Sequence, residues 1–239
     1  SSKFDFFTMK ERLFGGIMLK YILHSKSQFV ALSEPIARAL EINGVSSDRI
    51  KIIPNGVAVS DPVLQSPISP SIGFVGRLEA VKRPSIMIGL AQNFPEAKFH
   101  LFGDGSLRSK LEEEVSSRGI ENLIFHGEVF DIEAIYDSVS FIVLPSLAEG
   151  MSNTLLESIV RGKACLVTDL PENKSLFRHS KSIVKYVDSD RESDWCSALI
   201  QLMDVPKKDI AYDRDQLIKY YNIRSVVSSY ISLYRTLLA

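Results

Sequence analysis

The stretch Leu144-Pro-Ser-Leu-Ala-Glu-Gly-Met-Ser-Asn-Thr-Leu-Leu-Glu157 decides how the chain is organised. It leaves an apolar strand predicted over Phe141–Leu144 and turns into a helix predicted over Asn153–Arg161. Glu149 precedes that helix and Glu157 lies in its second turn. A helix N-terminus suits phosphate groups, and a carboxylate accepts hydrogen bonds from sugar hydroxyls. The stretch therefore fits a ligand that carries both phosphate and sugar.

Ser152 or Asn153 can cap the predicted helix, which leaves free backbone N–H groups pointing beyond the strand end. In an open parallel sheet, ligands bind at that edge. The alternative is structural: Glu157 and Arg161 lie four residues apart on one helical face and could form an ion pair on a solvated surface. Periodicity alone favours neither interpretation.

Composition predicts an ordinary globular protein of one large or two modest domains, since the chain has 239 residues, of which 24% are charged. A formal net charge of −1 gives no general attraction to nucleic acid. The two cysteines, Cys165 and Cys196, are too few for a disulfide framework and fit a cytoplasmic protein. No apolar run reaches the roughly 18–20 residues of a membrane-spanning helix.

The first segment is aromatic and basic. The chain begins Ser-Ser-Lys without a methionine, which is typical of a trimmed start. Residues 4–26 have helical apolar spacing with interspersed lysines and arginine. Such a helix can pack on a missing domain, which is the commoner explanation, or lie peripherally on the inner face of an anionic membrane.

From residue 28 onward, short apolar strands alternate with helices. Strands are expected at 29–32, 51–53, 72–75, 98–102, 123–125, 141–144, 164–167 and 183–187, and helices at 35–42, 84–93, 107–118, 132–138, 153–161 and 192–203. Residues 61–70 read as a proline-rich connector, and residues 210–238 as two helices. The apolar stripe of the second of these comprises Val226, Tyr230, Leu233, Tyr234 and Leu237. The alternation predicts an α/β protein with a Rossmann-like, doubly wound parallel sheet.

Several short motifs occur in a fixed order along the chain. They are Phe29-Val-Ala-Leu-Ser33, Pro54-Asn-Gly-Val57, Gly73-Phe-Val-Gly-Arg-Leu78, Phe102-Gly-Asp-Gly105, Ile124-Phe-His-Gly127 and the pair Glu149 and Glu157. Together they resemble the retaining glycosyltransferases of family 4, whose two-domain architecture is called GT-B. The resemblance covers roughly residues 28–239 and implies one half of a GT-B fold, the nucleotide-sugar-binding domain with its C-terminal helices. Residues 1–27 would then be a trailing segment of a missing N-terminal domain.

Two cations follow the strand expected at 72–75. Arg77 and Lys82 lie five residues apart, after Gly76, and a guanidinium fork and an ammonium suit phosphate oxygens. Spacing alone favours two solvated basic side chains near Glu79. The resemblance implies instead that Arg77 and Lys82 bind the diphosphate.

Two loops offer weaker signals. Gly103-Asp-Gly105 is explained by a tight strand–helix turn, and we expect Gly103 only to line the site. The loop that follows Gly127 is ordinary by its residues, and Phe130 would more commonly belong to a core. The resemblance implies that Glu128, Val129 and Phe130 form the rim of the nucleobase site.

The resemblance gives the two glutamates different roles. Glu149 would bind hydroxyls of the transferred sugar near the anomeric carbon, and Glu157 would bind the ribose. The backbone at Gly150, Met151, Ser152, Asn153 and Thr154 would face the donor. The reaction would be metal-independent retaining transfer, with a UDP-sugar favoured over a GDP-sugar. No metal or cofactor site is expected, because the four histidines lack ligand spacing.

The segment after the strand at 164–167 departs from the family pattern. Many relatives carry glycine and then glutamate near the sugar, whereas this chain has Thr168-Asp-Leu-Pro-Glu-Asn-Lys-Ser-Leu-Phe177, with Glu172 and Ser175 near those places. The resemblance therefore does not specify the sugar.

We expect a hexosyltransferase donor domain that acts on a glycan or lipid-linked acceptor in surface polysaccharide biosynthesis and is inactive without the acceptor domain. The alternative is a catalytically inactive nucleotide-sugar-binding module. A sugar-nucleotide epimerase ranks lower because its signature disagrees with the spacing of Glu149 and Glu157. A dehydrogenase ranks last, since no Gly-x-Gly-x-x-Gly opens a strand–helix turn.

Overall fold

The computed structural model describes residues 27–59, 70–178, 180 and 182–238. The amphipathic helix expected within residues 4–26 and most of the connector expected at 61–70 lie outside these ranges. The chain divides into two compact units, Ser1–Pro54 and Asn55–Ala239. The domain boundary expected near residue 27 falls within the first unit and stays a prediction.

The described part of the first unit is a small β–α–β element. Strands β1 (Phe29–Ala31) and β2 (Ile50–Ile52) pair in parallel, with helix α2 (Glu34–Ile42) and the short 3-10 helix η1 (Ser47–Arg49) between them. Ser33 caps α2, and its hydroxyl accepts a hydrogen bond from the Ile36 N–H. The small core comprises Ala31, Ala37, Val45 and Ile53.

The second unit is built on one six-stranded sheet whose neighbouring strands are all parallel. The strands are β3 (Ser71–Val75), β4 (Lys98–Phe102), β5 (Leu123–Gly127), β6 (Phe141–Leu144), β7 (Ala164–Thr168) and β8 (Val184–Val187). Their spatial order is β5-β4-β3-β6-β7-β8, which is the order of the doubly wound Rossmann fold. The order reverses between β3 and β6, so the ligand-binding crevice of this fold is expected beyond the carboxyl ends of those two strands.

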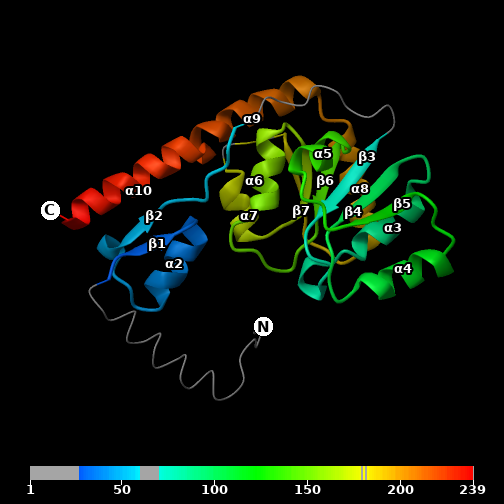
Figure 1. Cartoon of the computed structure of the whole chain (residues 1–239), viewed down its shortest axis with the longest axis horizontal. Coiled ribbons are helices and arrows are strands. Elements are labelled where there is room, and N and C mark those ends of the chain that lie inside the picture. The colour runs from blue at the N-terminus through cyan, green and yellow to red at the C-terminus, as the bar shows by residue number, and fades with distance from the viewer. Residues whose placement is uncertain (1–26, 60–69, 179, 181, 239) are drawn as a thin grey trace, which may run out of the picture. The chain divides into compact units, whose positions relative to one another are not determined.

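Helices cover both faces of this sheet (Figure 1). They are α3 (Ile86–Asn93), α4 (Arg108–Ser117), α5 (Ile132–Asp137), α6 (Asn153–Val160), α7 (Pro171–Leu176), α8 (Glu192–Met203), α9 (Lys207–Tyr221) and α10 (Ile223–Leu238), with the 3-10 helix η2 (Ala80–Lys82) before α3. Helix α3 packs against α8, and α6 packs against α9. Right-handed crossovers place α3 and α4 on one face, and α5, α6 and α7 on the other.

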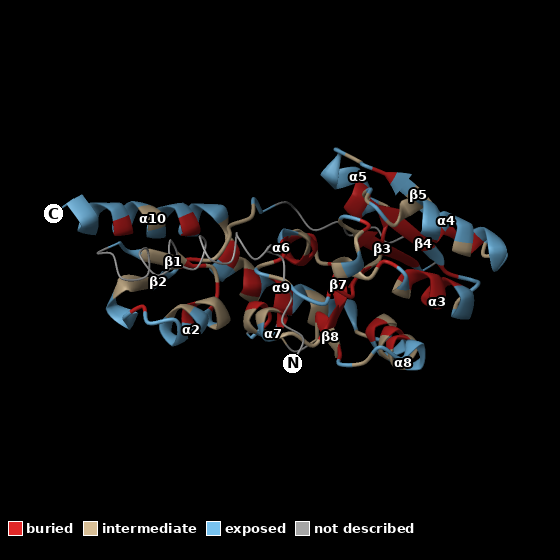
Figure 2. Ribbon diagram, turned by 90° about the horizontal axis from the view of Figure 1, so that it is seen from below, coloured by how far each residue is buried: buried red, intermediate tan, exposed pale blue. Residues whose placement is uncertain are grey.

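The core lies between the sheet and these helices. Figure 2 shows the buried residues concentrated in the strands and on the sheet-facing sides of the helices. Among the largest fully buried side chains are Phe74, Phe99, Tyr136, Phe177 and Trp195. This packing fixes the strand ends that carry the candidate site.

The predicted α/β class and parallel sheet are confirmed, and most expected elements agree with the structure to within a few residues. Helix α7 is absent from the prediction, which assigned no helix or strand to residues 168–177. The stripe expected on α10 is partly wrong: Val226 and Leu233 are buried, but Tyr234 and Leu237 are more than half exposed.

Candidate functional site

The loops that follow β3 and β6 are joined at the point where the strand order reverses. The N–H of Leu147 donates to the carbonyl of Val81 at 2.8 Å. The Lys82 ammonium lies 2.6 Å from Oε1 of Glu149, with side-chain exposures of 20% and 8%. The sequence-predicted sugar carboxylate and one predicted phosphate cation are therefore in direct contact.

The first turn of α6 lies against the end of β3. Ser152 is the N-cap, and its hydroxyl accepts from the N–H of Leu155 at 3.4 Å. The Thr154 hydroxyl donates to the carbonyl of Val75, the last residue of β3, at 3.3 Å. The N-terminal N–H groups of α6 thus start beside the end of β3, from which Arg77 and Lys82 follow, and their binding of phosphate stays a prediction.

Asn55 holds the turn that precedes α6. Its backbone N–H donates to the sulfur of Met151 at 3.2 Å, and its side-chain amide donates to Oδ1 of Asn153 at 2.9 Å. Gly56 lies so close to helix α10 that an added Cβ would come within 2.8 Å of the Ile223 side chain. Asn55 therefore supports the N-terminal turn of α6, a role that the sequence did not suggest. Gly150 and Asn153 are exposed, and Met151 is half-buried.

Arg77 is exposed, and its side chain forms no hydrogen bond or ion pair with the described residues, although its backbone carbonyl accepts from the Glu79 N–H at 2.9 Å. Nearby, the hydroxyl and N–H of Ser106 donate to Glu79 at 2.7 and 3.0 Å. These hydrogen bonds lower the pKa of the Glu79 carboxyl, with a smaller contribution from the charge of Arg77. Arg77 is therefore a cation whose charge is available to an anion above β3.

The glycines at the strand ends allow close approach of backbones. The N–H of Gly76 donates to the Phe102 carbonyl, and the N–H of Gly103 donates to the Gly127 carbonyl at 2.7 Å. Gly103 has φ +129°, and a Cβ there would lie 2.1 Å from the Gly76 carbonyl oxygen. The tight-turn explanation of Gly103 is thus sufficient on its own.

The expected nucleobase rim follows β5. Glu128 is exposed, and Val129 is half-buried. Phe130 is 89% exposed, so the alternative that places it in the core is wrong. An exposed ring at the end of a parallel strand is available to a planar ligand.

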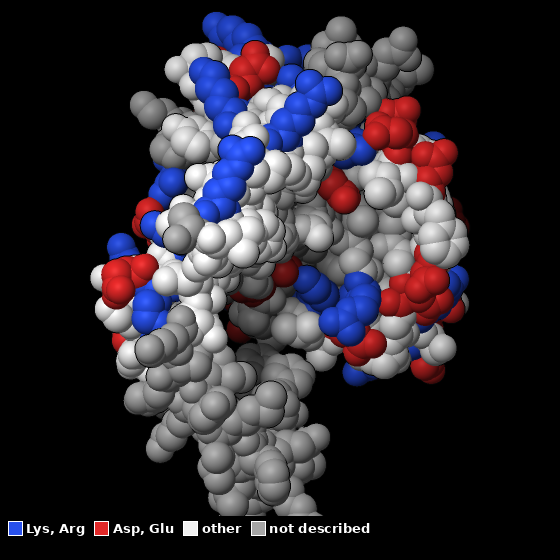
Figure 3. Space-filling model, turned by 60° about the vertical axis from the view of Figure 1, so that its left-hand side comes forward, with Lys and Arg blue, Asp and Glu red and all other residues white. Residues whose placement is uncertain are grey.

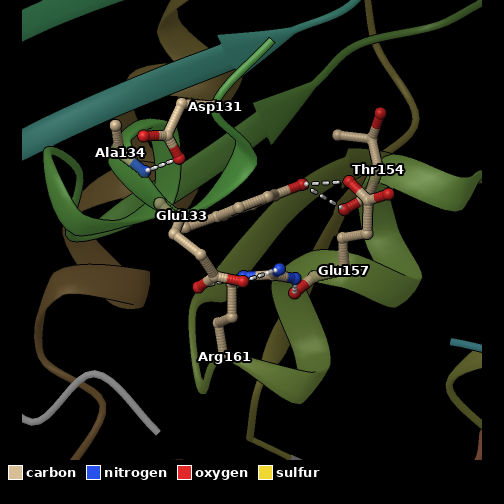
Figure 4. Close-up of polar contacts among 7 residues, drawn as sticks. Asp131, Glu133, Ala134, Thr154, Glu157 and Arg161 are labelled. Carbon is tan, nitrogen blue, oxygen red and sulfur yellow. Dashed lines mark hydrogen bonds and ion pairs between the residues drawn. The ribbon is translucent and has the colours of Figure 1, made fainter. Parts of the chain in front are cut away.

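Glu157 does not form the expected alternative ion pair with Arg161. Arg161 instead binds the Glu133 carboxylate at 2.5 and 3.2 Å and donates to the backbone carbonyl of Glu157. The Glu157 carboxylate accepts from the Tyr136 hydroxyl at 3.2 Å. Figure 4 shows Glu157 and Arg161, on the same helix, with different partners.

Tyr136 is fully buried, and its hydroxyl also lies 3.1 Å from the Thr154 carbonyl. Burial raises the pKa of Tyr136, and the nearby Glu157 charge raises it further. The phenol is therefore a neutral donor that orients Glu157 from within the core. Apart from an aromatic residue on the buried side of a short helix, no sequence pattern indicated this role.

His100 and His126 meet on β4 and β5, although the sequence did not pair them. Nδ1 of His100 lies 2.8 Å from Nε2 of His126, whose ring stacks on Phe102 with centroids 4.4 Å apart. Burial lowers the pKa of His100 to about 4, with a smaller contribution from His126. Within the described residues, no group of three or more His, Cys, Asp or Glu side chains could hold a metal ion.

A hollow of about 310 Å³ lies at the carboxyl ends of β7 and β8, beside the loop that carries Glu149. It is lined by Arg83, Leu147, Thr168, Asp169, Leu170, Asp188, Ser189 and Asp190. The departure from the family pattern lies here: only Asp169 and Leu170 separate β7 from α7, which carries Glu172 and Ser175.

The charged surface is mixed. On the face drawn in Figure 3, acidic and basic side chains both occur, with uncharged surface between them. None of the described helices is both long enough and apolar enough to cross a membrane. Membrane contact through residues 4–26 stays a prediction.

Comparison with known proteins identifies the family of this chain. Residues 69–204 match the profile of the family described as Glycosyl transferases group 1. The chain is 20% identical over 229 residues to a poly(ribitol-phosphate) alpha-N-acetylglucosaminyltransferase of Staphylococcus aureus, covering 91% of this chain and 46% of that protein. It is 32% identical over 144 residues to a GalNAc-alpha-(1->4)-GalNAc-alpha-(1->3)-diNAcBac-PP-undecaprenol alpha-1,4-N-acetyl-D-galactosaminyltransferase of Campylobacter jejuni. The match covers 54% of this chain and 40% of that protein. The chain thus spans about half the length of these curated relatives.

Solved structures share the fold. Anabaena HepE in complex with UDP and glucose superposes with a TM-score of 0.79 at 17% identity, covering 92% of this chain and 66% of that one. Sucrose-phosphate synthase from Thermosynechococcus elongatus superposes with a TM-score of 0.83 at 18% identity, covering all of this chain and 64% of that one.

Proposed function

The chain belongs to the Glycosyl transferases group 1 family, and from that membership we propose that it is the donor-binding half of a retaining GT-B enzyme. It binds a nucleoside diphosphate sugar and supplies the hexosyl group for transfer to a glycan or lipid-linked acceptor. The names of the relatives given above refer to poly(ribitol-phosphate) and to an undecaprenol-linked glycan, which supports a role in surface polysaccharide biosynthesis.

The observation that carries this proposal is the contact between Lys82 and Glu149 beside the N-terminus of α6. A carboxylate, an ammonium and free helix N–H groups converge at the switch point of the sheet. This combination matches a sugar joined to a phosphate, because hydroxyls donate to a carboxylate while phosphate oxygens accept from cations and N–H groups.

The donor groups divide among the neighbouring residues. Arg77, Lys82 and the backbone at Gly150–Thr154 bind the diphosphate. Glu157, held by Tyr136, accepts from the ribose hydroxyls. Glu128, Val129 and Phe130 border the base, and Gly76 and Gly103 line the floor where strand ends approach closely.

In the reaction, the bond between the anomeric carbon and the phosphate oxygen breaks, and the diphosphate leaves with the electron pair. The acceptor oxygen forms a bond to the same face of the sugar, and its proton passes to the departing phosphate oxygen. The transition state is oxocarbenium-like, so stabilising the negative charge on the leaving group is much of the catalysis. An ammonium has three donors, so Lys82 can bind a phosphate oxygen while it contacts Glu149. In this proposal the cations and helix N–H groups supply the positive charge, and no metal is needed.

The acceptor half is the proposed partner. In a GT-B enzyme the reacting groups meet in a cleft between two domains, so we expect this chain alone to bind donor but transfer poorly. Joining it to an acceptor half should restore transfer; a joined protein that binds donor but stays inactive would favour a binding module.

A thermal-shift panel with UDP, GDP, ADP and their sugars tests donor binding. A ligand at about 100 times its dissociation constant stabilises the folded state by roughly 2.7 kcal/mol. We expect the largest shift with UDP and UDP-sugars. No shift with any nucleotide would contradict the proposal.

A further inference from the structure

Arg83 combines an unfavourable backbone conformation with a fully engaged side chain. It is the C-cap of η2 and has φ +49° and ψ +49°. No other non-glycine residue in the described ranges has a positive φ. Glycine would adopt this left-handed conformation with less strain. An arginine at this position therefore indicates a function for its side chain.

The guanidinium joins four segments of the second unit. Its Nε donates to the carbonyl of Pro145 at 2.6 Å, directly after β6, and one terminal nitrogen donates to the Thr168 hydroxyl at 3.2 Å, at the end of β7. The other terminal nitrogen forms an ion pair with Asp190, after β8, and the guanidinium lies 5.6 Å from the centre of the Trp195 ring. The side chain is only 14% exposed.

These contacts hold the loop that carries Glu149. Consecutive residues Val81, Lys82 and Arg83 contact Leu147, Glu149 and Pro145, respectively. Arg83 fixes the start of the β6–α6 loop, and Lys82 binds its outer part. The left-handed turn at Arg83 lets adjacent side chains reach these separate targets.

We propose that Arg83 is a positioning residue that sets the place of Glu149 relative to the diphosphate site. This inference rests on the proposed function. Loss of the guanidinium should weaken recognition of the sugar far more than recognition of the nucleotide, because Arg77 and the α6 N-terminus do not depend on Arg83.

The test compares the affinities of UDP and UDP-glucose for the chain by calorimetry. Arg83→Gly removes the side chain but relieves the backbone strain, so the turn can persist. We expect its UDP affinity to stay within about threefold of wild type, while UDP-glucose binding weakens on the order of 10- to 100-fold, the loss typical of a hydrogen bond to a charged group. Arg83→Lys should restore little, since a single ammonium cannot reproduce the fork.

Thr168→Val removes one acceptor of the guanidinium without changing the packing volume, and it should shift the same affinity ratio in the same direction by less. It keeps the test valid if Arg83→Gly does not fold. Arg118→Ala, an exposed arginine paired with Gln92 and Glu114, is the control and should change neither affinity. If the wild-type protein binds no UDP, the proposed function itself is contradicted. Equal losses for UDP and UDP-glucose, or no loss, in the Arg83 variants would overturn the positioning role alone.

Discussion

The ammonium nitrogen of Lys82 lies 2.6 Å from Oε1 of Glu149. This contact joins the loops after β3 and β6, where the strand order reverses and ligands of doubly wound folds bind. An ion pair at this place, with only 8% of the Glu149 side chain exposed, sets a carboxylate and a cation where a sugar phosphate would need both.

Replacing Glu149 with Gln keeps the shape of the side chain but removes its charge. We expect transfer by the chain joined to an acceptor half to fall on the order of 100-fold, a loss of roughly 3 kcal/mol of transition-state stabilisation. UDP affinity should change little, because in our proposal the carboxylate contacts the sugar. Steady-state kinetics and UDP titration measure the two quantities. Glu112→Gln, in an exposed helical pair with Arg108, should leave both unchanged, and a Glu149→Gln variant with wild-type transfer would exclude the assigned role.

Arg77→Ala should weaken UDP binding without lowering the melting temperature. The side chain is exposed and forms no ion pair in the described ranges, so its removal disturbs no packing, while a charge-assisted hydrogen bond is worth about 1.5–3 kcal/mol. Isothermal titration with uridine and with UDP separates the contribution of the phosphates to the binding free energy from that of the nucleoside, since only UDP carries phosphates. Lys110→Ala on α4 is the matched exposed cation and should have no effect. Equal weakening for uridine and UDP would place Arg77 away from the phosphates.

Glu157→Gln should reduce discrimination between UDP and 2′-deoxy-UDP. In our proposal the Glu157 carboxylate accepts from the ribose hydroxyls, so the wild-type protein is expected to prefer UDP. Tyr136→Phe removes the hydroxyl that lies 3.2 Å from Glu157 and should reduce the preference by less, with a stability loss of about 1 kcal/mol for the buried hydrogen bond. Competition binding with both nucleotides gives the ratios. An unchanged ratio in Glu157→Gln would assign the ribose to another residue.

Acid should destabilise the fold through His100. The pKa of this buried imidazole is lowered from 6.5 to about 4, so between these values the unfolded chain binds a proton that the folded chain does not. Stability is therefore fully present above pH 6.5 and falls by roughly 3 kcal/mol as the pH is lowered to about 4, at about 1.4 kcal/mol per pKa unit.

His100→Phe retains a ring beside Phe102 and His126 but cannot titrate. Urea unfolding of both proteins across this pH range isolates the contribution of His100, since carboxylate titrations are common to both. The stability of the variant should fall less steeply with acid. Parallel curves for the two proteins would show that His100 titrates normally.

Much of the fold was predictable from local patterns. Short apolar strands bounded by glycine and alternating with helices predicted the sheet, and the run from Leu144 to Glu157 predicted the turn and helix at its switch point. Helix α7 was not predicted, because its six residues, Pro171–Leu176, have no clear helical spacing of apolar residues. The spacing of Tyr234 and Leu237 fitted the apolar stripe of α10. Burial, however, depends on which elements pack against the helix, and residue spacing carries no information about that.

The candidate site was predictable only in part. Glu149 and Lys82 were assigned through the family resemblance and the cap of α6 through its residues, and the structure brings Lys82 and Glu149 into contact. The partners of Glu157 and Arg161 were not predictable. Whether these two residues pair with each other or with Tyr136 and Glu133 depends on where α5 lies. Arg83 and Asn55 gave no signal either, since their contacts are with residues more than 60 and 90 positions away.

A structure of the chain with bound UDP would locate the diphosphate. We expect the diphosphate to lie within hydrogen-bonding distance of Arg77 and of the N–H groups at residues 151–154, with the ribose at Glu157. A diphosphate bound elsewhere, with Arg77 and the N-terminus of α6 both out of reach, would contradict the proposed donor site.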